Sequence, residues 1–427
     1  MTARSARRRY LTLIALRWLP VGLLIPVFVL LPLSRGLSLT EIGLAFSAQG
    51  LVVLVLELPT GGLSDSLGRR PVLILAEVVA FLSLATLFFA DSVAMFAAAM
   101  VLQGIFRALD SGPLEAWYVD ATLAADPDAR IESGLGAGSS VLSVAIAGGA
   151  LLSGGLVAVH PVASIDTLAL PVLIALTLHL LNLGAIVLLL TEVRVARGVR
   201  AIAGSVRAVP SVIGDGLRLL RSSRVLLALV LVELFWGFSM VTFESFFPIR
   251  LSEVVGDTDN AAALMGPVSS AAWFASAAGA AIIATISRRV GVARSAAVLR
   301  ILQGLTIVAM GLIAGPVGVV SAYLACYVTH GASNPMHMTL LHRQVDGPHR
   351  TTVLSMNSMV AQPAGAIGAI VLAALADGTS LATAFVVGGI ACTVAAPLYI
   401  PAWRAEQRRR KALDEVGVPA EVSDSRA

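Results

Sequence analysis

Nine acidic or arginine side chains interrupt the long apolar runs of this 427-residue sequence, and they are the residues most able to do chemistry. A charge at the centre of a lipid bilayer costs about 2.5 to 3.5 kcal/mol on insertion scales, so such residues usually face a cavity or a partner. Because burial disfavours the charged form of a carboxyl group, a buried acid can bind and release protons near neutral pH. The nine residues are Arg17, Glu57, Glu77, Arg107, Asp110, Glu115, Glu233, Glu244 and Arg300.

The apolar runs around these residues indicate the class of the protein. The sequence is 57% hydrophobic and only 13% charged, which is too apolar for a soluble protein of this length. A helix needs about 20 apolar residues to cross the hydrocarbon core of a membrane, so we expect an all-α membrane protein. Twelve spans are expected, near residues 10–33, 41–63, 71–90, 93–115, 133–158, 167–190, 225–248, 261–286, 294–314, 317–340, 352–376 and 381–403.

The distribution of basic residues predicts the orientation in the membrane. If the N-terminus is cytoplasmic, 25 of the 30 Lys and Arg residues fall in cytoplasmic segments and only Arg35 and Arg250 fall outside. Cytoplasmic loops carry such an excess, and misplacing one span would reverse every later loop. We therefore expect both termini in the cytoplasm. The same asymmetry accounts for the formal net charge of +4, so no nucleic-acid partner is expected.

The sequence also divides into two halves of six expected spans each. The longest polar stretch between spans separates a first bundle (1–190) from a second (225–403), leaving a central cytoplasmic loop (191–224) and a cytoplasmic tail expected to be disordered (404–427). Three landmarks recur in order at offsets of 220 to 223 residues: Gly68 with Gly291, Pro113 with Pro335, and Gly148 with Gly368. Internal repeats of this kind are typical of transporters, so we expect two related bundles.

The stretch GGLSDSLGRR, residues 61–70, places one carboxylate and two guanidiniums beside glycines after the second expected span. A degenerate copy follows the eighth span at residues 287–294. The stretch resembles the signature loop between the second and third helices of the major facilitator superfamily, at Gly61, Asp65, Gly68, Arg69 and Arg70. This resemblance implies twelve transmembrane helices in two pseudo-symmetric six-helix halves. It also implies a secondary transporter that works by alternating access, with its substrate site near the bilayer midplane between the halves.

The resemblance gives this loop the role of a latch. Gly61 permits close helix approach, Gly68 permits a tight turn, and Asp65 can accept hydrogen bonds from an arginine or a neighbouring helix N-terminus. Glu57, two turns before Asp65, is expected to belong to the same gate. Such a cluster would hold the halves together on the cytoplasmic side when the cavity faces outward. Anchoring by cytoplasmic basic residues is the alternative, but it explains only the two arginines.

The fourth expected span, QGIFRALDSGPLEAWYVD, holds three of the ionisable candidates. Arg107 and Asp110 stand three residues apart, so they share a helical face and can neutralise each other. Glu115 lies beyond Pro113, where we expect the helix to kink or end. All three are candidates for proton coupling or substrate binding. For Arg107 and Asp110, a purely structural ion pair is the alternative.

The seventh expected span places Glu233, Trp236, Met240 and Glu244 on one helical stripe. Carboxylates within an aromatic and thioether stripe suit a cavity wall for an apolar or cationic substrate, although ordinary helix packing produces the same pattern. Either acid could carry the coupling proton. Arg17 stands at a comparable depth in the first span, so it is a further candidate. The sequence permits a pair between Arg17 and Glu233 across the pseudo-twofold axis.

The tenth and fifth spans contain candidates of another kind. In the tenth, His330, Asn334 and His337 fall near one face, and Pro335 is expected to open the helix locally. Asn334 and His337 are candidate cavity-wall residues, and each histidine is either a proton relay or a packed hydrogen-bonding residue. The fifth span resembles the glycine-rich motif of facilitator drug antiporters, which suggests efflux, although the proline expected within that motif is missing. The matching residues are Gly148, Gly149, Gly154 and Gly155.

Several function classes are disfavoured by what the sequence lacks. The single lysine, Lys411, lies in the tail, so no phosphate-binding loop for ATP-driven transport exists in this chain. Cys326 and Cys392 are isolated within spans, which argues against a disulfide framework or a cysteine metal site. No zinc-binding His/Glu pattern or nucleophile elbow indicates a membrane enzyme. We therefore expect no cofactor and no metal.

The function that these observations favour is secondary transport. We expect a monomer that exports a hydrophobic or amphipathic small molecule in exchange for protons, because the spans offer few polar groups for a sugar or a peptide. Proton-coupled uptake of a small metabolite is the main alternative, and a non-transporting membrane receptor or assembly protein is the alternative from another class. Arginine outnumbers lysine 29 to 1, as in GC-rich bacterial genomes, so a bacterial inner membrane is the expected location.

Overall fold

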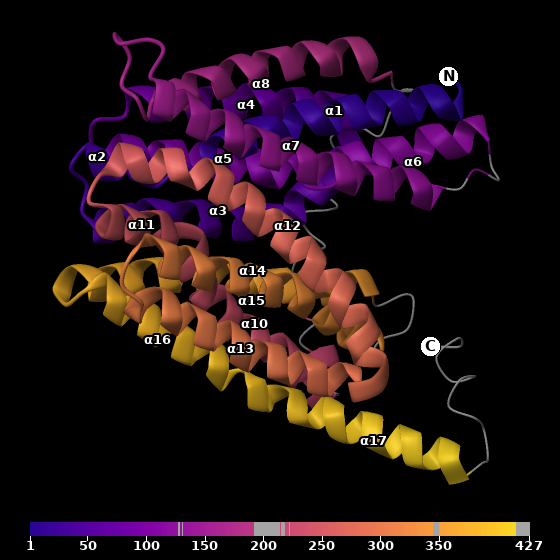
Figure 1. Cartoon of the computed structure of the whole chain (residues 1–427). Coiled ribbons are helices and arrows are strands. Elements are labelled where there is room, and N and C mark those ends of the chain that lie inside the picture. Colours follow the sequence, from indigo (N-terminus) through magenta and orange to yellow (C-terminus); the bar gives the residue numbers. More distant parts are fainter. Residues whose placement is uncertain are drawn as a thin grey trace. The chain divides into compact units, whose positions relative to one another are not determined.

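The computed structural model describes residues 1–126, 129, 131–191, 214, 218–221, 223–344 and 350–415. Every regular element in these ranges is helical, which confirms the expected all-α class (Figure 1). Ten of the described helical segments are long and apolar enough to cross a membrane. The chain forms two compact units: the first comprises residues 1–209 and 248–273, and the second comprises residues 210–247 and 274–427.

The first unit contains the helices that correspond to the first six expected spans. Within it α1 packs against α7 and α8, α3 packs against α5, and α4 packs against α5 and α8. Most of α11 (Phe247–Val255) and the first part of α12 (Thr258–Val290) also belong to this unit. Its other helices are α1 (Ala3–Leu24), α2 (Leu30–Ser34), α3 (Leu39–Leu67), α4 (Arg69–Phe89), α5 (Val93–Asp110), α6 (Pro113–Ala125), α7 (Ile131–Val159) and α8 (Leu170–Leu189).

The second unit repeats this arrangement of helix contacts. Here α10 packs against α15 and α16, and α13 packs against α14 and α16, which are the counterparts of the α1 and α4 contacts in the first unit. A π-helical turn (Thr242–Phe246) follows α10, and a 3₁₀ turn (Ala396–Tyr399) follows α16. The helices are α10 (Arg224–Val241), α13 (Val292–Leu312), α14 (Pro316–His342), α15 (Arg350–Gly378), α16 (Leu381–Val394) and α17 (Ile400–Glu415), with the second part of α12.

The glycines at the start of α4 and α13 have the same backbone conformation. Gly68 has φ of 93° and ψ of 158°, and Gly291 has φ of 96° and ψ of 149°. A side chain is strained at these positive φ values, so glycine is required to turn the chain directly from one helix into the next. The landmark that predicted an internal repeat therefore marks the same turn in both halves.

The two proline landmarks behave differently. In the first unit α5 ends at Asp110, Gly112 adopts φ of 93°, and Pro113 begins α6, so the expected break at Pro113 is confirmed. Proline suits the first turn of a helix because its missing N–H would have no partner there. In the second unit α14 runs from Pro316 to His342 without a break, so the expectation that Pro335 opens the helix is wrong. Neighbouring helices can stabilise a proline inside a transmembrane helix.

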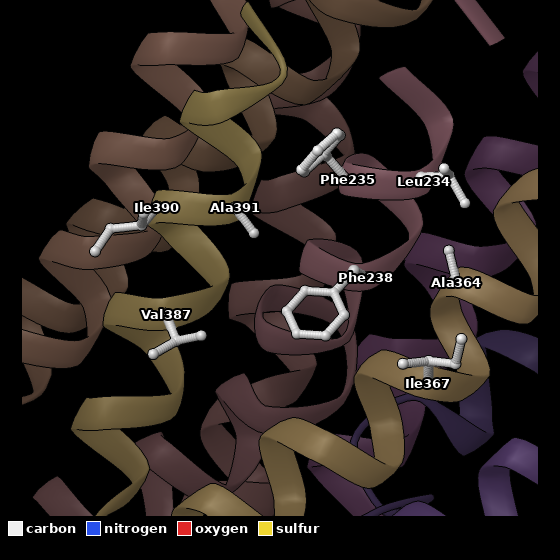
Figure 2. Close-up of a pocket in the computed structure, with 8 residues that line it drawn as sticks. All are labelled: Leu234, Phe235, Phe238, Ala364, Ile367, Val387, Ile390 and Ala391. Atoms are coloured by element: carbon white, nitrogen blue, oxygen red, sulfur yellow. The ribbon is translucent and has the colours of Figure 1, made fainter. Parts of the chain in front are cut away.

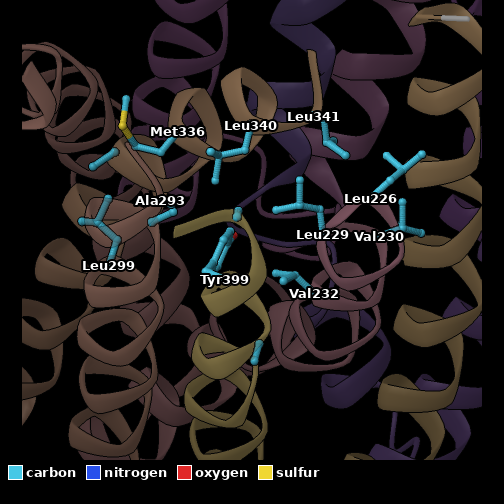
Figure 3. Packing of buried hydrophobic residues seen from close by; sticks show 14 of the residues in the cluster. Leu226, Leu229, Val230, Val232, Ala293, Leu299, Met336, Leu340, Leu341 and Tyr399 are labelled. Atoms are coloured by element: carbon cyan, nitrogen blue, oxygen red, sulfur yellow. The ribbon is translucent and has the colours of Figure 1, made fainter. Parts of the chain in front are cut away.

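Each unit has its own apolar core, and both cores include aromatic residues near one end of the bundle. In the first unit the rings of Tyr10 and Tyr118 stack with centroids 4.5 Å apart. In the second unit Leu226, Leu229 and Tyr399 pack together beneath the end of α14 (Figure 3). Packing of this kind fixes the relative position of the helices that carry the ionisable residues.

The last helix is longer than the sequence predicts. We expected the final span to end at residue 403, but α17 continues to Glu415. Residues 416–427 of the expected disordered tail lie outside the described part of the chain. A contact of Glu406 with the start of α13, described below, explains why the helix continues beyond the apolar run.

Candidate functional site

A buried ion pair joins α1 and α5 of the first unit. The guanidinium of Arg17 binds the carboxylate of Asp110 through Nε and Nη2. The Asp110 side chain is 1% exposed and the Arg17 side chain 19%, so the pair is largely desolvated. Sequence spacing suggested Arg107 as the partner of Asp110, but the buried partner comes from another helix and Arg107 itself is exposed. Removing one member of such a pair typically costs about 3 to 5 kcal/mol.

A second buried cluster joins α4 and α8 of the same unit. Nδ1 of His179 lies 2.7 Å from Oε2 of Glu77, and Nδ2 of Asn182 donates to Oε1 of Glu77 at 2.8 Å. All three residues are buried. Phe106 packs edge-on against the His179 ring at 5.7 Å, and it lies one helical turn before Asp110. The two clusters of the first unit therefore adjoin along α5.

The sequence placed Glu77 inside the membrane but gave no partner for it. His179 and Asn182 were missed because two polar residues in one apolar span do not reveal which helix they face. Their spacing of three residues was the available signal, since it puts them on one face of a helix.

In the second unit the acid Glu233 lies among basic partners from two other helices. Its Oε1 is 3.2 Å from Nε2 of His337 on α14 and 4.0 Å from Nη2 of Arg300 on α13. The side chains of all three residues are at most 7% exposed. The sequence named Glu233 as a proton carrier and His337 as a cavity-wall residue, and the structure brings the two together. Arg17 and Glu233 each have their charged partners within their own unit.

The hydrogen bonds around His337 define its protonation. Nε2 of His337 faces the acceptor oxygens of Glu233 and Asn357, so it carries a proton, and the Tyr399 hydroxyl can donate to Nδ1 of His337, 3.0 Å away. This arrangement corresponds to a neutral histidine with its proton on Nε2.

The neighbouring histidine has a similar environment. Arg300 donates from Nη1 to Oε1 of Gln303 at 2.8 Å, which turns the Gln303 amide nitrogen toward Nδ1 of His330 at 3.4 Å. Since the amide nitrogen can only donate, Nδ1 of His330 accepts. Gln303, Asn357 and Tyr399 were not recognised from the sequence, because neutral polar residues are common in transmembrane helices.

An aromatic wall lies beside this network on α10 and α14. The rings of Trp236 and His330 stack at 5.9 Å with an angle of 10°, and Phe243 and Tyr327 pack around the same histidine. Trp236 and Met240 are half-buried, and their role as cavity-wall residues remains a prediction. The sequence predicted the α10 side of this wall but missed Tyr323 and Tyr327 on α14.

Four candidates lie on exposed positions of helices rather than in buried pairs. Arg107 and Glu115 are exposed on α5 and α6, Glu244 on the π-helical turn, and Asn334 on α14. An ionised group on a transmembrane helix is rarely directed toward lipid and usually faces a water-filled cavity. By this principle the exposed Arg107, Glu115 and Glu244 are expected to face water rather than lipid.

The predicted latch loop is anchored within the first unit. Arg69 donates to the carbonyl oxygen of Ala116 at 2.7 Å and pairs with Asp120 at 2.5 Å, both on α6. Arg70 donates to the carbonyl oxygen of Val187 on α8 at 2.6 Å. The start of α4 is thus fixed to the fourth and sixth spans. The side chains of Glu57, Gly61 and Asp65 lie outside the described residues.

The degenerate copy of the loop is anchored by a residue that the sequence did not reveal. Glu406 on α17 accepts from the backbone N–H groups of Val292 and Ala293 at 3.3 and 3.1 Å, and from Arg343 at 3.0 Å. A carboxylate at a helix N-terminus satisfies unpaired N–H groups and interacts favourably with the helix dipole. Each half therefore ties the start of its third helix to its fourth and sixth spans, with opposite charges.

The four motif glycines of α7 lie in two kinds of environment, close helix contacts and open space. A side chain on Gly149 would meet the backbone of α1 at Leu23 and Gly22, and one on Gly154 would meet Gly266 of α12. Gly148 and Gly155 face open space. Close helix packing therefore accounts for half of the motif.

A separate groove of about 480 Å³ lies on the surface of the second unit, between α10, α15 and α16 (Figure 2). Leu234, Phe238, Ile367 and Ile390 line it together with four other apolar residues, and no polar side chain enters it. Since its lining offers no polar group to orient a ligand, this groove is not the candidate site.

A protein-family model described as Major Facilitator Superfamily matches residues 11–329. The chain belongs to the major facilitator superfamily. It is therefore a multi-pass membrane transporter, and the expected fold of twelve helices in two pseudo-symmetric halves is confirmed. A curated relative, the uncharacterized MFS-type transporter YxaM of Bacillus subtilis (strain 168), is 29% identical over 103 residues. That alignment covers 24% of this chain and 26% of the relative.

Solved structures of transporters share this major facilitator fold. The nucleoside transporter NupG aligns with a TM-score of 0.75 and 13% identity, over 92% of this chain and 98% of NupG. A structure described under substrate recognition in proton dependent oligopeptide transporters aligns with a TM-score of 0.72 and 13% identity, over 95% of this chain and 99% of the other. At such low identity, these similarities concern the fold alone.

Proposed function

We propose that this major facilitator is a proton-coupled exporter of hydrophobic or amphipathic small molecules, with a preference for cations. The observation that carries the proposal is the presence of buried acids paired with basic groups in both units, at Asp110, Glu77 and Glu233. A transporter that used no proton would have little reason to keep desolvated acids within its spans, because they are costly to bury.

The preference for cations is supported by the aromatic wall of the second unit. Trp236 and Tyr327 offer ring faces, and the exposed carboxylate of Glu244 lies on the turn that follows α10. Aromatic faces and a carboxylate together attract organic cations by cation–π and Coulomb interactions. The direction of export is supported by the resemblance of the α7 glycines to those of facilitator drug antiporters.

Proton-coupled uptake is the second candidate, and the fold comparison supports it. The structural relatives named above are described as a nucleoside transporter and as proton dependent oligopeptide transporters. The buried ionisable groups are equally compatible with symport. A non-transporting receptor or assembly role is disfavoured by family membership.

We further propose a monomer in a bacterial inner membrane with both termini in the cytoplasm. The loop that contains Asp65 would latch the cytoplasmic side in the outward-facing state, and the intra-unit anchors of Arg69 and Arg70 would hold that loop in position. No resident cofactor is required for this mechanism, since the proton gradient supplies the energy.

Substrate-dependent proton flux tests the proposal. The purified full-length protein is reconstituted in liposomes with a trapped pH-sensitive dye, and lipophilic cations and neutral drugs are added singly. We expect cations to produce a proton flux that is absent from protein-free liposomes. A flux with nucleosides or peptides and none with lipophilic compounds would support uptake instead. No flux with any of these compounds would contradict proton coupling.

A further inference from the structure

Among the described side chains of the first unit, the buried ionisable groups do not balance in charge unless a proton is bound. Arg17 neutralises Asp110, whereas the partners of Glu77 are His179 and Asn182. If His179 is uncharged, the cluster holds one excess negative charge inside the helix bundle. An unpaired buried charge is strongly unfavourable, and one added proton removes it.

The corresponding network of the second unit balances without a proton. Glu233 and Arg300 carry opposite charges 4.0 Å apart. The hydrogen-bond directions described above leave Nδ1 of both His330 and His337 as an acceptor, so neither histidine needs to be charged. Although Glu233 is one of the two acids that sequence reasoning favours as proton carrier, the charge balance favours Glu77.

The geometry around Glu77 suits a shared proton. The 2.7 Å separation between Nδ1 of His179 and Oε2 of Glu77 is typical of a charge-assisted hydrogen bond. Asn182 holds the other carboxylate oxygen, which fixes the orientation of the acid. The side chains of His179 and Glu77 are only 4% and 2% exposed, and Phe106 packs edge-on against the imidazole, so the pair is desolvated. A proton held here is stabilised whether it resides on the imidazole or on the carboxyl group.

The helices packed against α4 carry few other charged groups, and Arg70 of α4 itself donates to the carbonyl oxygen of Val187 on α8. On α5, Arg107 is exposed, and Arg69 at the start of α4 pairs with the exposed Asp120 of α6. Glu115 of α6 is exposed, and His179 is the only titratable residue of α8. Among the described side chains of α3, the charged residue is Glu41. It lies in the first turn of the helix and accepts a hydrogen bond from the backbone N–H of Ser38.

We propose that the coupling proton of this transporter is bound between Glu77 and His179, at the contact of its third and sixth helices. The proposal rests on the proposed proton coupling. While α4 and α8 are packed together, the proton neutralises the buried cluster of Glu77, His179 and Asn182. When water enters between α4 and α8, both charge states are solvated, and the proton can leave.

The protonation of His179 can be measured without any substrate. The full-length protein is labelled with ¹⁵N-histidine, and its ring nitrogens are observed by NMR in detergent at pH 7.5, about one unit above the pH of ~6.5 at which an ordinary histidine titrates. The signal of His179 is assigned by its loss in His179→Gln, or, if that variant does not fold, by replacing the other five histidines one at a time. Infrared spectra of the wild type and Glu77→Gln report a protonated carboxyl group.

We expect either a doubly protonated His179 or a carboxylic-acid band that Glu77→Gln removes. A neutral His179 together with an ionised Glu77 would overturn the proposal. This result is independent of transport, so it separates failure of this proposal from failure of the proposed function.

The transport test uses Glu77→Gln, which mimics the protonated acid without changing its shape. We expect at least a tenfold loss of substrate-driven proton flux, while exchange of labelled for unlabelled substrate continues. Asp91→Asn, an exposed acid in the loop before α5, is the matched control and should retain wild-type flux. Wild-type proton flux in folded Glu77→Gln protein would also overturn the proposal.

Discussion

Glu77 and Arg300 occupy the same position in the third helix of each half, nine residues after Gly68 and Gly291 respectively. Both are buried, and each interacts with a residue of the sixth span of its half: Glu77 is hydrogen-bonded to His179, and Arg300 interacts electrostatically with Tyr399. The internal repeat therefore keeps the location of a buried polar contact while reversing its charge. This difference is why the two halves have different needs for a proton.

The Arg17 pair can be tested by a double-mutant cycle. Arg17→Gln and Asp110→Asn should each destabilise the protein, and the double variant should be more stable than the sum of the two effects predicts, by about 0.5 to 3 kcal/mol. Arg17→Gln combined with Glu233→Gln should be additive within about 0.5 kcal/mol, because the charged partners of these two residues lie in separate units. Thermal unfolding in detergent measures both. Coupling of Arg17 with Glu233 instead of Asp110 would contradict the observed pairing.

Glu406 should protect the backbone at the start of α13. In Glu406→Gln the carboxylate charge that accepts from Val292 and Ala293 is lost, so their amide hydrogens should exchange with solvent faster, by about tenfold. Hydrogen exchange followed by mass spectrometry can resolve this segment. Glu253→Gln, a change at an exposed acid of the first unit, serves as the control. Unchanged exchange at residues 292–293 would show that the carboxylate does not cap this helix.

Two neighbouring glycines of α7 provide a matched test of helix packing. Gly149→Ala would place a methyl group 2.9 Å from the Leu23 backbone nitrogen on α1, whereas Gly148→Ala would enter open space. Overpacking typically costs about 1 to 3 kcal/mol, so only the Gly149 variant should lose thermal stability. Equal stability of the two variants would exclude close α1–α7 contact at this position.

Glu244 should determine the preference for cationic substrates. We expect Glu244→Gln to raise the KM for lipophilic cations by about tenfold, which corresponds to ~1.4 kcal/mol, and to leave neutral substrates unaffected. Transport assays in liposomes with one cation and one neutral compound of similar size make the comparison. An equal change for both compounds would indicate a structural role for this residue.

Much of the fold was predictable because long apolar runs have a direct physical meaning in a membrane. All twelve expected spans coincide with one helix or with consecutive helical segments, and the break before Pro113 follows from the chemistry of proline. The opposite outcome at Pro335 was not predictable, because tolerance of a proline depends on the helices packed around it.

The candidate site was predictable only in part. Buried acids and arginines stand out in an apolar span, so Arg17, Asp110 and Glu233 were recognised. Their partners were not, because the partner of a charged residue is chosen by helix packing rather than by spacing along one helix. His179, Tyr399 and the other neutral partners carry no comparable signal.

The direction in which a proton gradient drives the substrate tests the central claim most directly. Liposomes containing the protein are prepared with an acidic interior, and a lipophilic cation identified in the flux assay is added outside at low concentration. Proton-coupled export predicts accumulation of the cation inside, because protons leave as it enters, and no accumulation when the interior is alkaline. Accumulation only with an alkaline interior, or accumulation independent of the gradient, would contradict the account.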